Sequence, residues 1–109
     1  MLILARDEVI AALLGLMVEL RGMRPTFLKE GESVADAVRR AGGSPVLIDC
    51  DHPECTEDAI AQIKKSGAEP VIFSPFRMQT EMTSLATRYR TKSFTLPTDP
   101  ETFGRLLKS

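Results

Sequence analysis

The apolar residues of the chain fall into short continuous runs that alternate with longer runs at helical spacing. A continuous apolar run of about three to five residues, bounded by turn-forming residues, is typical of a strand buried on both faces. Apolar positions that recur every three or four residues predict an amphipathic helix. The predicted strands are 2–5, 24–28, 46–49, 70–74 and 93–97. The predicted helices are 7–21, 33–41, 56–65, 77–89 and 98–107.

This alternation predicts an α/β fold. Strands that alternate with helices form a parallel sheet with helices on both of its faces. A length of 109 residues is ordinary for one domain, so we expect a single domain over 1–109. Pro25 predicts that the second strand lies at an edge of the sheet or begins there, because proline cannot donate a ladder hydrogen bond.

The first predicted helix is the most apolar part of the chain. Between Glu8 and Glu19 it has ten residues without a charge. We expect a helix with so wide an apolar surface to be covered on most sides. The apolar positions are Val9, Ile10, Leu13, Leu14, Leu16, Met17 and Leu20. Gly15 costs a helix about 1 kcal/mol relative to alanine, which predicts close packing at that point. A membrane span needs about 20 apolar residues, so we expect a cytoplasmic protein without membrane contact.

Composition and charge narrow the function classes. The net charge is −1, and no general basic field is present to attract nucleic acid, so we expect no nucleic-acid partner. The basic run over 88–92 is interpreted as a solvated face. The two cysteines lie too close in sequence for a disulfide framework.

Polar residues gather where the predicted strands end. The carboxyl ends of parallel strands share one edge of the sheet, which is where ligands bind in open α/β folds. Four predicted strands carry candidate residues at that edge. In chain order these are Arg6 with Asp7, Asp49, Ser74, and Leu96 with Pro97.

These strand ends resemble the pattern of response-regulator receiver domains from two-component (phosphorelay) signalling. The matching segments are LILARDE, LIDCDHP, VIFSP and FTLP, in the order and at the spacings of that family. Because they run from the first predicted strand to the last, the resemblance extends over essentially the whole chain. The resemblance implies a flavodoxin-like, three-layer α/β/α fold with five parallel strands in the order 2-1-3-4-5. The first and third strands would then be neighbours, and Asp7 and Asp49 would face each other across one cleft.

The resemblance also implies a role for four residues. Asp49 matches the phosphoacceptor that takes a phosphoryl group from a histidine kinase, and Asp7 matches the second acid of the acidic pocket. Ser74 matches the hydroxyl switch that senses the phosphoryl group. Mg²⁺ would be held by Asp7, Asp49 and the carbonyl of Asp51.

Several positions depart from the family pattern and mark the site as degenerate. Arg6 replaces the first acid of the pair, and Leu96 replaces the lysine that holds phosphoryl oxygens. Ser93 stands where a switch aromatic is common. Pro75 has no N–H, although the family uses the backbone N–H at that place to bind the phosphoryl group. Pro97 is expected to follow a cis peptide bond, as the equivalent proline often does in the family.

The exchange at Arg6 has the largest electrostatic effect. It changes the local charge by two units, and one pair of unit charges about 4 Å apart is worth about 4 kcal/mol at an effective dielectric of 20. We therefore expect weak Mg²⁺ binding, with Arg6 pairing with Asp49 or Asp7 in place of the metal. The predicted function is a phosphorylation-independent interaction module and not an enzyme. The alternative is a working receiver, phosphorylated on Asp49 by a histidine kinase with Mg²⁺.

Simpler interpretations stay open beside this one. Asp49 is also explained as a strand-end acid satisfied by backbone N–H groups, and Arg6 as a solvated side chain. Cys50, His52 and Cys55 are possible soft metal ligands, but His52 is the only histidine and a fourth ligand is missing. A Cys50–His52 nucleophilic pair lacks a third, orienting group.

The predicted partner is another protein. In receivers, the fourth helix, fifth strand and fifth helix form the surface that meets partners or a twin subunit. The resemblance therefore implies a protein contact on that face, with a histidine kinase or a second copy in a homodimer as the candidates.

Overall fold

The computed structural model describes residues 1–53, 55–75, 79–96, 101, 103 and 105. The strands are β1 (Leu2–Leu4), β2 (Thr26–Phe27), β3 (Val46–Asp49), β4 (Pro70–Pro75) and β5 (Lys92–Leu96). The helices are α1 (Glu8–Leu20), α2 (Val34–Ala41), α3 (Glu57–Lys65) and α4 (Gln79–Tyr89). Each lies where the apolar pattern predicts an element, to within a few residues.

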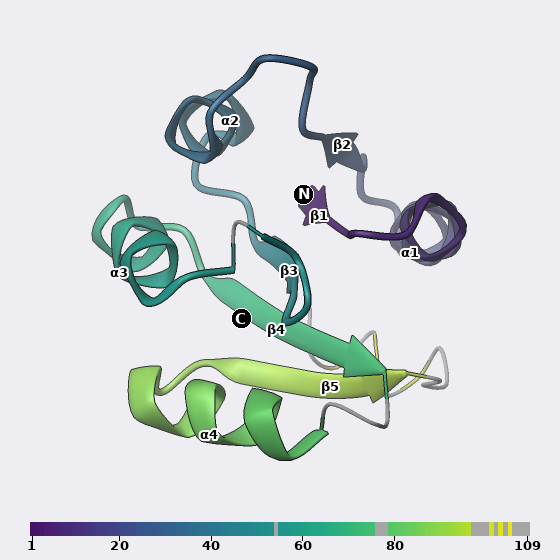
Figure 1. Ribbon diagram of the computed structural model, residues 1–109. Coiled ribbons are helices and arrows are strands. Elements are labelled where there is room, and N and C mark those ends of the chain that lie inside the picture. The colour runs from purple at the N-terminus through teal and green to yellow at the C-terminus, as the bar shows by residue number, and fades with distance from the viewer. Residues whose placement is uncertain (54, 76–78, 97–100, 102, 104, 106–109) are drawn as a thin grey trace.

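All five strands are parallel and lie in the order β2-β1-β3-β4-β5 (Figure 1). This confirms the flavodoxin-like order that the resemblance implies, and it confirms that the strand after Pro25 is an edge strand. In the register of the sheet, Leu4 lies beside Ile48 and Asp49 lies beside Phe73. The carboxyl ends of β1, β3 and β4 therefore meet at one edge.

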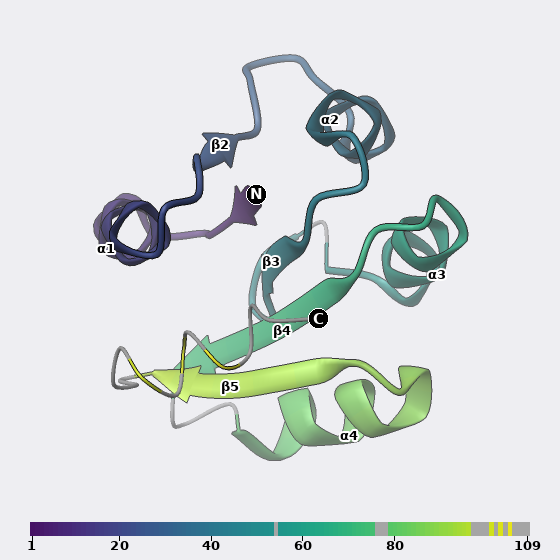
Figure 2. The ribbon, with the colours of Figure 1, turned by 180° about the vertical axis from the view of Figure 1, so that it is seen from behind.

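Side chains alternate between two cores on the two faces of the sheet. Leu2 and Leu4 belong to the core under α2, α3 and α4, whereas Ile3 belongs to the core under α1. The second core also contains a row of three phenylalanines. Phe94 stacks on Phe73 and meets Phe103 edge-on, each pair with ring centroids 5.5 Å apart. The result is the expected three-layer arrangement (Figures 1 and 2).

The helix starts follow the capping residues of the sequence. Ser33 Oγ accepts a hydrogen bond from the N–H of Asp36, and Thr56 Oγ1 accepts one from the N–H of Ala59. Such caps satisfy N–H groups that have no partner inside the helix. Gly42 ends α2 in the left-handed conformation, at φ 66°, which glycine adopts without steric cost.

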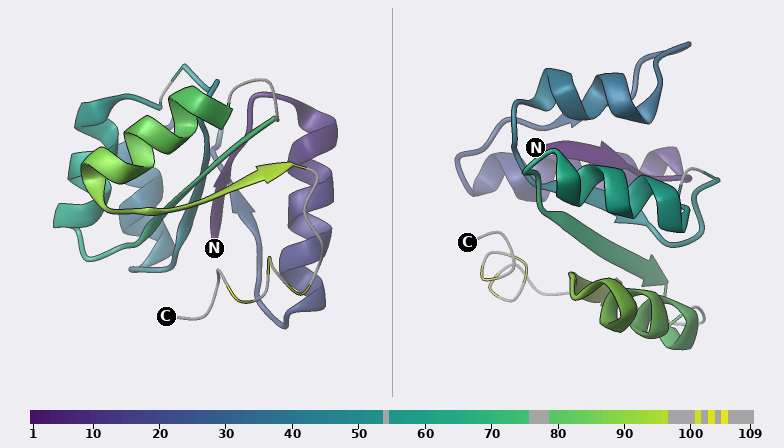
Figure 3. Two further views of the ribbon diagram at one scale, coloured as in Figure 1. Left: turned by 90° about the horizontal axis from the view of Figure 1, so that it is seen from below. Right: turned by 90° about the vertical axis from the view of Figure 1, so that its left-hand side faces the viewer.

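The prediction that the first helix is covered on most sides is wrong. Only Leu14, Gly15 and Val18 of α1 are buried, because α1 lies at one edge of the molecule and packs on the sheet through one side (Figure 3). Ile10 and Met17 are partly buried against the core under α1, but the exposed fractions of four other large apolar residues are high. They are 75% for Val9, 47% for Leu13, 54% for Leu16 and 73% for Leu20.

The close packing predicted at Gly15 is confirmed. A Cβ atom placed on Gly15 would lie 3.2 Å from Cζ of Phe27 and 3.8 Å from Cβ of Pro25. The glycine therefore lets the chain of the edge strand pass close to α1.

Two predictions fall on parts of the chain at the carboxyl end. Most of the predicted helix 98–107 lies outside the described residues, although Phe103 is helical and fully buried. Pro97, with its expected cis bond, also lies outside them. None of the described helices is both long enough and apolar enough to cross a membrane.

Candidate functional site at the carboxyl edge of the sheet

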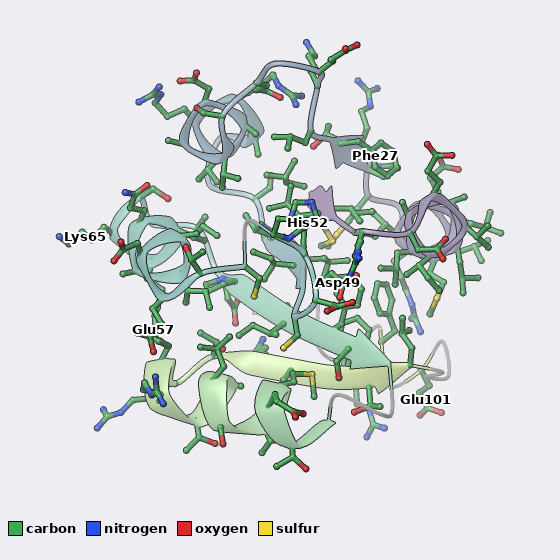
Figure 4. All side chains as sticks on the ribbon, in the orientation of Figure 1. Phe27, Asp49, His52, Glu57, Lys65 and Glu101 are labelled. Carbon is green, nitrogen blue, oxygen red and sulfur yellow. The ribbon has the colours of Figure 1, made fainter. Side chains whose placement is uncertain are left out.

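Asp49 ends β3 and is held by backbone groups from two segments. Its side chain is almost fully buried, with 6% of the residue exposed. Oδ2 accepts a hydrogen bond of 3.2 Å from the N–H of Arg6, and Oδ1 accepts one of 2.9 Å from the N–H of Asp51. Figure 4 shows Asp49 at the end of β3 and His52 in the following loop. The carboxylate therefore ties the β1–α1 connection to the β3–α3 loop.

The side chain of Arg6 reaches a different acid from those expected. Its Nη1 donates a 2.8 Å hydrogen bond to Oδ2 of Asp51, in an ion pair whose side chains are 63% and 29% exposed. The expectation that Arg6 pairs with Asp49 or Asp7 thus needs correction. Only its backbone N–H contacts Asp49, because the guanidinium extends past Asp49 to the loop beyond it.

Asp7 is the N-cap of α1. Its Oδ1 accepts hydrogen bonds from the N–H of Val9 at 2.7 Å and from the N–H of Ile10 at 3.4 Å. The carboxylate is exposed and lies at the positive end of the helix dipole, which stabilises its charge. The structure thus gives Asp7 a local structural role, and its part in an acidic pocket stays a prediction.

Ser74 lies on the next strand and is fully buried. Among the described residues, its Oγ has no hydrogen-bond partner. A buried hydroxyl without a partner costs about 1–3 kcal/mol, so its position at the carboxyl end of β4 calls for an explanation. An oxygen atom of a ligand bound at this edge would give the hydroxyl a hydrogen-bond partner.

The two positions of β5 that belong to the family pattern, Ser93 and Leu96, carry neither an aromatic ring nor a cation. Leu96 packs against the core under α1, in the place where a receiver would carry its lysine. Ser93 is half-buried, and the adjacent Phe94 is buried against Phe73 on the other face of the sheet. Pro75 lies beside Leu96 in the register of β4 and β5.

Comparisons with known proteins find similarity in structure alone. No protein-family model matches the chain, and no curated protein matches it by sequence. A response regulator receiver domain protein from Clostridium thermocellum superposes with a TM-score of 0.74 at 15% identity, over 97% of this chain and 88% of that one. The signal receiver domain of a modulated diguanylate cyclase from Desulfovibrio desulfuricans G20 superposes with a TM-score of 0.75 at 18% identity, over 98% and 88%.

The chain has the fold of response-regulator receiver domains. A third similar structure belongs to a family of redox sensors in the streptococci that evolved from two-component response regulators. It has a TM-score of 0.69 and 14% identity, and the match covers 95% of this chain but 47% of that one. The similar structures with this fold therefore come from several different kinds of protein.

The receiver fold implies a Mg²⁺ site at this edge, and the residues present do not fit one. Both oxygens of Asp49 accept backbone N–H groups, the carboxylate of Asp7 caps α1, and that of Asp51 is paired with a guanidinium. Mg²⁺ needs oxygen ligands in octahedral geometry, whereas a guanidinium offers only donors. Within the described part of the chain, no three His, Cys, Asp or Glu side chains are grouped so as to hold a metal ion.

The thiols of Cys50 and Cys55, in the segment after β3, are poorly suited to nucleophilic chemistry. Burial raises the pKa of Cys55 to about 12, with smaller contributions from Cys50 and Asp49. Burial, together with the charges of Asp49, Glu81 and Asp51, also raises the pKa of Cys50. Because the thiolate is the reactive form, this environment disfavours both the metal-site and the nucleophile interpretations.

We expect both thiols to stay protonated well above neutral pH. A Cys55 pKa that is higher in the folded state than in the unfolded state stabilises the fold below about pH 9, and that contribution is lost as the pH rises toward about 12. In the folded protein at pH 8, iodoacetamide should modify the thiols at least about tenfold more slowly than in urea. In the Cys55→Ser variant, the fall in the free energy of unfolding between about pH 9 and about pH 12 that the thiol causes should be absent. Equal modification rates in the folded and unfolded protein would contradict this result.

The basic run near the start of β5 is engaged in local contacts. Arg88 pairs with Glu57 of α3, and Lys92 pairs with Glu69 at 3.2 Å. These pairs join α4 and β5 to neighbouring elements, in keeping with the interpretation of the run as part of a solvated face.

The contact between Arg6 and the side chain of Asp51 was not predicted from the sequence. The resemblance assigned Asp51 only a backbone carbonyl. The available signal was the positive charge of Arg6 in a candidate site with three acids, Asp7, Asp49 and Asp51.

Proposed function

We propose that the protein is a receiver-like signalling module of the two-component type that works in the cytoplasm through protein contacts. It acts without Mg²⁺-dependent phosphorylation of Asp49 and is not an enzyme. The ion pair between Arg6 and Asp51 is the observation that carries this proposal. It supports the proposal because it brings a guanidinium to an acid of the candidate site, where receiver chemistry needs a divalent metal.

Charge accounts for the loss of phosphorylation. Phosphoryl transfer depends almost wholly on the placement of cations around the phosphoryl oxygens. A guanidinium on Asp51 neutralises one acid and repels a second cation. An exposed ion pair of this kind adds only about 0–1 kcal/mol to stability, so its importance lies in the charge and not in the bond.

Two further exchanges act in the same direction. Leu96 removes the lysine that would hold a phosphoryl oxygen, and Pro75 removes a backbone N–H that would bind another. An acyl phosphate on Asp49 would therefore lose three of its supports: the metal, the lysine and the amide.

The neighbours favour a protein partner. Among them are the receiver of a diguanylate cyclase and a DNA-binding response regulator of the LuxR family from Staphylococcus aureus. In this proposal the module likewise transmits its state to another protein. The candidate partners are a histidine kinase and a second copy, with the surface of α4, β5 and the following helix as one candidate contact face.

The second candidate is a working receiver phosphorylated on Asp49. The buried Ser74 Oγ favours it, because that hydroxyl has no partner among the described residues and would find one in a phosphoryl oxygen. In this case Arg6 would turn away from Asp51 when Mg²⁺ binds.

Acetyl phosphate separates the two candidates. The protein is incubated with acetyl phosphate and Mg²⁺ and analysed by intact mass spectrometry, with Asp49→Asn as the matched control. We expect no phosphate adduct on either protein. An adduct on the wild type that the Asp49→Asn variant lacks would overturn the proposal and establish the working receiver.

A further inference from the structure

The outer side of α1 carries an exposed apolar stripe formed by Val9, Leu13, Leu16 and Leu20. The exposed fractions run from 47% to 75% along it. Figures 1 and 2 view the molecule from opposite sides, and both place α1 at its edge with its outer side away from the sheet. We call these four residues the α1 stripe.

Within the described part of the chain, the four residues of the α1 stripe do not belong to either hydrophobic core. The side of α1 that faces the sheet is supplied by Leu14, Gly15 and Val18, which are buried. The outer side of such a helix ordinarily carries polar residues, and an exposed apolar patch of this kind marks an interaction surface.

In the described part of the chain, all the exposed large apolar residues lie on or beside α1. The large apolar side chains that are exposed there comprise the α1 stripe and Phe27, whose ring lies against Gly15 of α1. Figure 4 shows Phe27 on β2 beside that helix. The described part of α4, which belongs to the contact face suggested by the resemblance, exposes no such residue.

The spacing of the α1 stripe along the sequence is the same whether it is counted from Val9 or from Leu20. The four positions are separated by four, three and four residues, which is the seam of a helix pair in the heptad pattern. In an antiparallel pair about a two-fold axis, Val9 would lie against Leu20 of the second copy, and Leu13 against Leu16. A two-fold interface uses the same patch on both subunits. Because the spacing of the stripe is symmetric about its midpoint, each apolar residue would meet an apolar residue of the second copy.

The charges at the ends of α1 complement each other in the same arrangement. Glu8 precedes the stripe and Arg21 follows it, and both are exposed. The two-fold axis that pairs Val9 with Leu20 also brings Glu8 of each copy to Arg21 of the other. The antiparallel helix dipoles are favourable as well.

From the spacing, the end charges and the concentrated exposure, we propose that two copies of this chain associate through antiparallel contact of their α1 helices. A specific interface buries at least about 1,000 Å² in total, and Phe27 at the rim of the α1 stripe adds exposed apolar surface to the contact. A membrane surface fits less well, because the charged residues of α1 itself are Glu8 and Glu19, whereas interfacial helices are rich in Lys and Arg. The inference does not rest on the proposed function.

Sedimentation equilibrium tests the interface with a matched pair of variants. Leu13→Glu with Leu16→Glu places two like charges at the centre of the stripe, and Thr83→Glu with Thr87→Glu places two on the exposed side of α4. We expect the wild type and the α4 variant to be dimers. The α1 variant should dissociate at least about a hundredfold more readily, while circular dichroism shows both variants folded.

A charge exchange fixes the orientation. Glu8→Arg and Arg21→Glu should each weaken the dimer, and the two together should restore it. A monomeric wild type, a dimer that survives the α1 variant, or a lack of rescue in the double exchange would overturn the proposal. Co-sedimentation of a monomeric wild type with vesicles of phosphatidylcholine and phosphatidylserine would overturn it in favour of a membrane surface.

Discussion

Replacing Arg6 with aspartate should raise the affinity of the protein for Mg²⁺ by at least about tenfold. The exchange removes the guanidinium from Asp51 and returns an acid to the position before Asp7, a change of two charge units. At an effective dielectric of 20, one pair of unit charges about 4 Å apart is worth about 4 kcal/mol, and solvent at the exposed end of Arg6 reduces this. A remainder of about 1.4 kcal/mol still gives the tenfold change.

The matched control for this variant is Arg6→Lys. It keeps the cation and the backbone N–H that binds Asp49, so its affinity for Mg²⁺ should match that of the wild type. The readout is the change of amide chemical shifts near Asp49 and Asp51 as Mg²⁺ is added. If the aspartate and lysine variants bind Mg²⁺ equally, the charge of Arg6 does not control the site.

Two neighbouring leucines of α1 should differ sharply in their effect on stability. Leu14→Ala should lower the free energy of unfolding by about 2–5 kcal/mol, because Leu14 is fully buried and its loss leaves a cavity. Leu13→Ala should lower it by less than about 1 kcal/mol, because Leu13 is 47% exposed.

Urea denaturation at low protein concentration gives both values. A low concentration is needed because dimer formation adds to the apparent stability of the folded state. Comparable losses for the two variants would show that α1 is covered on its outer side as well, contrary to the structure.

The contrast between Leu13 and Leu14 also shows where the sequence could predict the fold and where it could not. Strand and helix positions followed from local spacing, since the period of apolar residues is set by the backbone. The sequence of α1 shows how much apolar surface the helix has, but it does not show what covers that surface. Apolar residues that contact a second molecule have the same spacing along a helix as apolar residues that pack in the core.

The strand order depended on more than local pattern. Alternating strands and helices predict a parallel sheet, but two small versions of that sheet share the same alternation. The motifs at Asp49 and Ser74 supplied the order through the resemblance, and the sheet confirmed it.

At the candidate site, backbone positions were predicted better than side-chain contacts. Asp49 lies at the end of its strand as expected, because a strand end is fixed by the sheet. The partner of Arg6 was not predicted, because a long side chain reaches several acids and its choice depends on the loop after β3. Asp7 was predicted at the start of the first helix, and its carboxylate is the N-cap of α1.

The measurement that tests the central claim most directly is an amide-shift titration of the wild-type protein with beryllofluoride and Mg²⁺. Beryllofluoride mimics a phosphoryl group on an aspartate, and it needs the metal and a free carboxylate oxygen to bind. Because the guanidinium of Arg6 on Asp51 opposes binding of the metal, we expect no widespread shifts at millimolar Mg²⁺. Saturable shifts that spread from Asp49 to Ser74 and β5 would contradict the account.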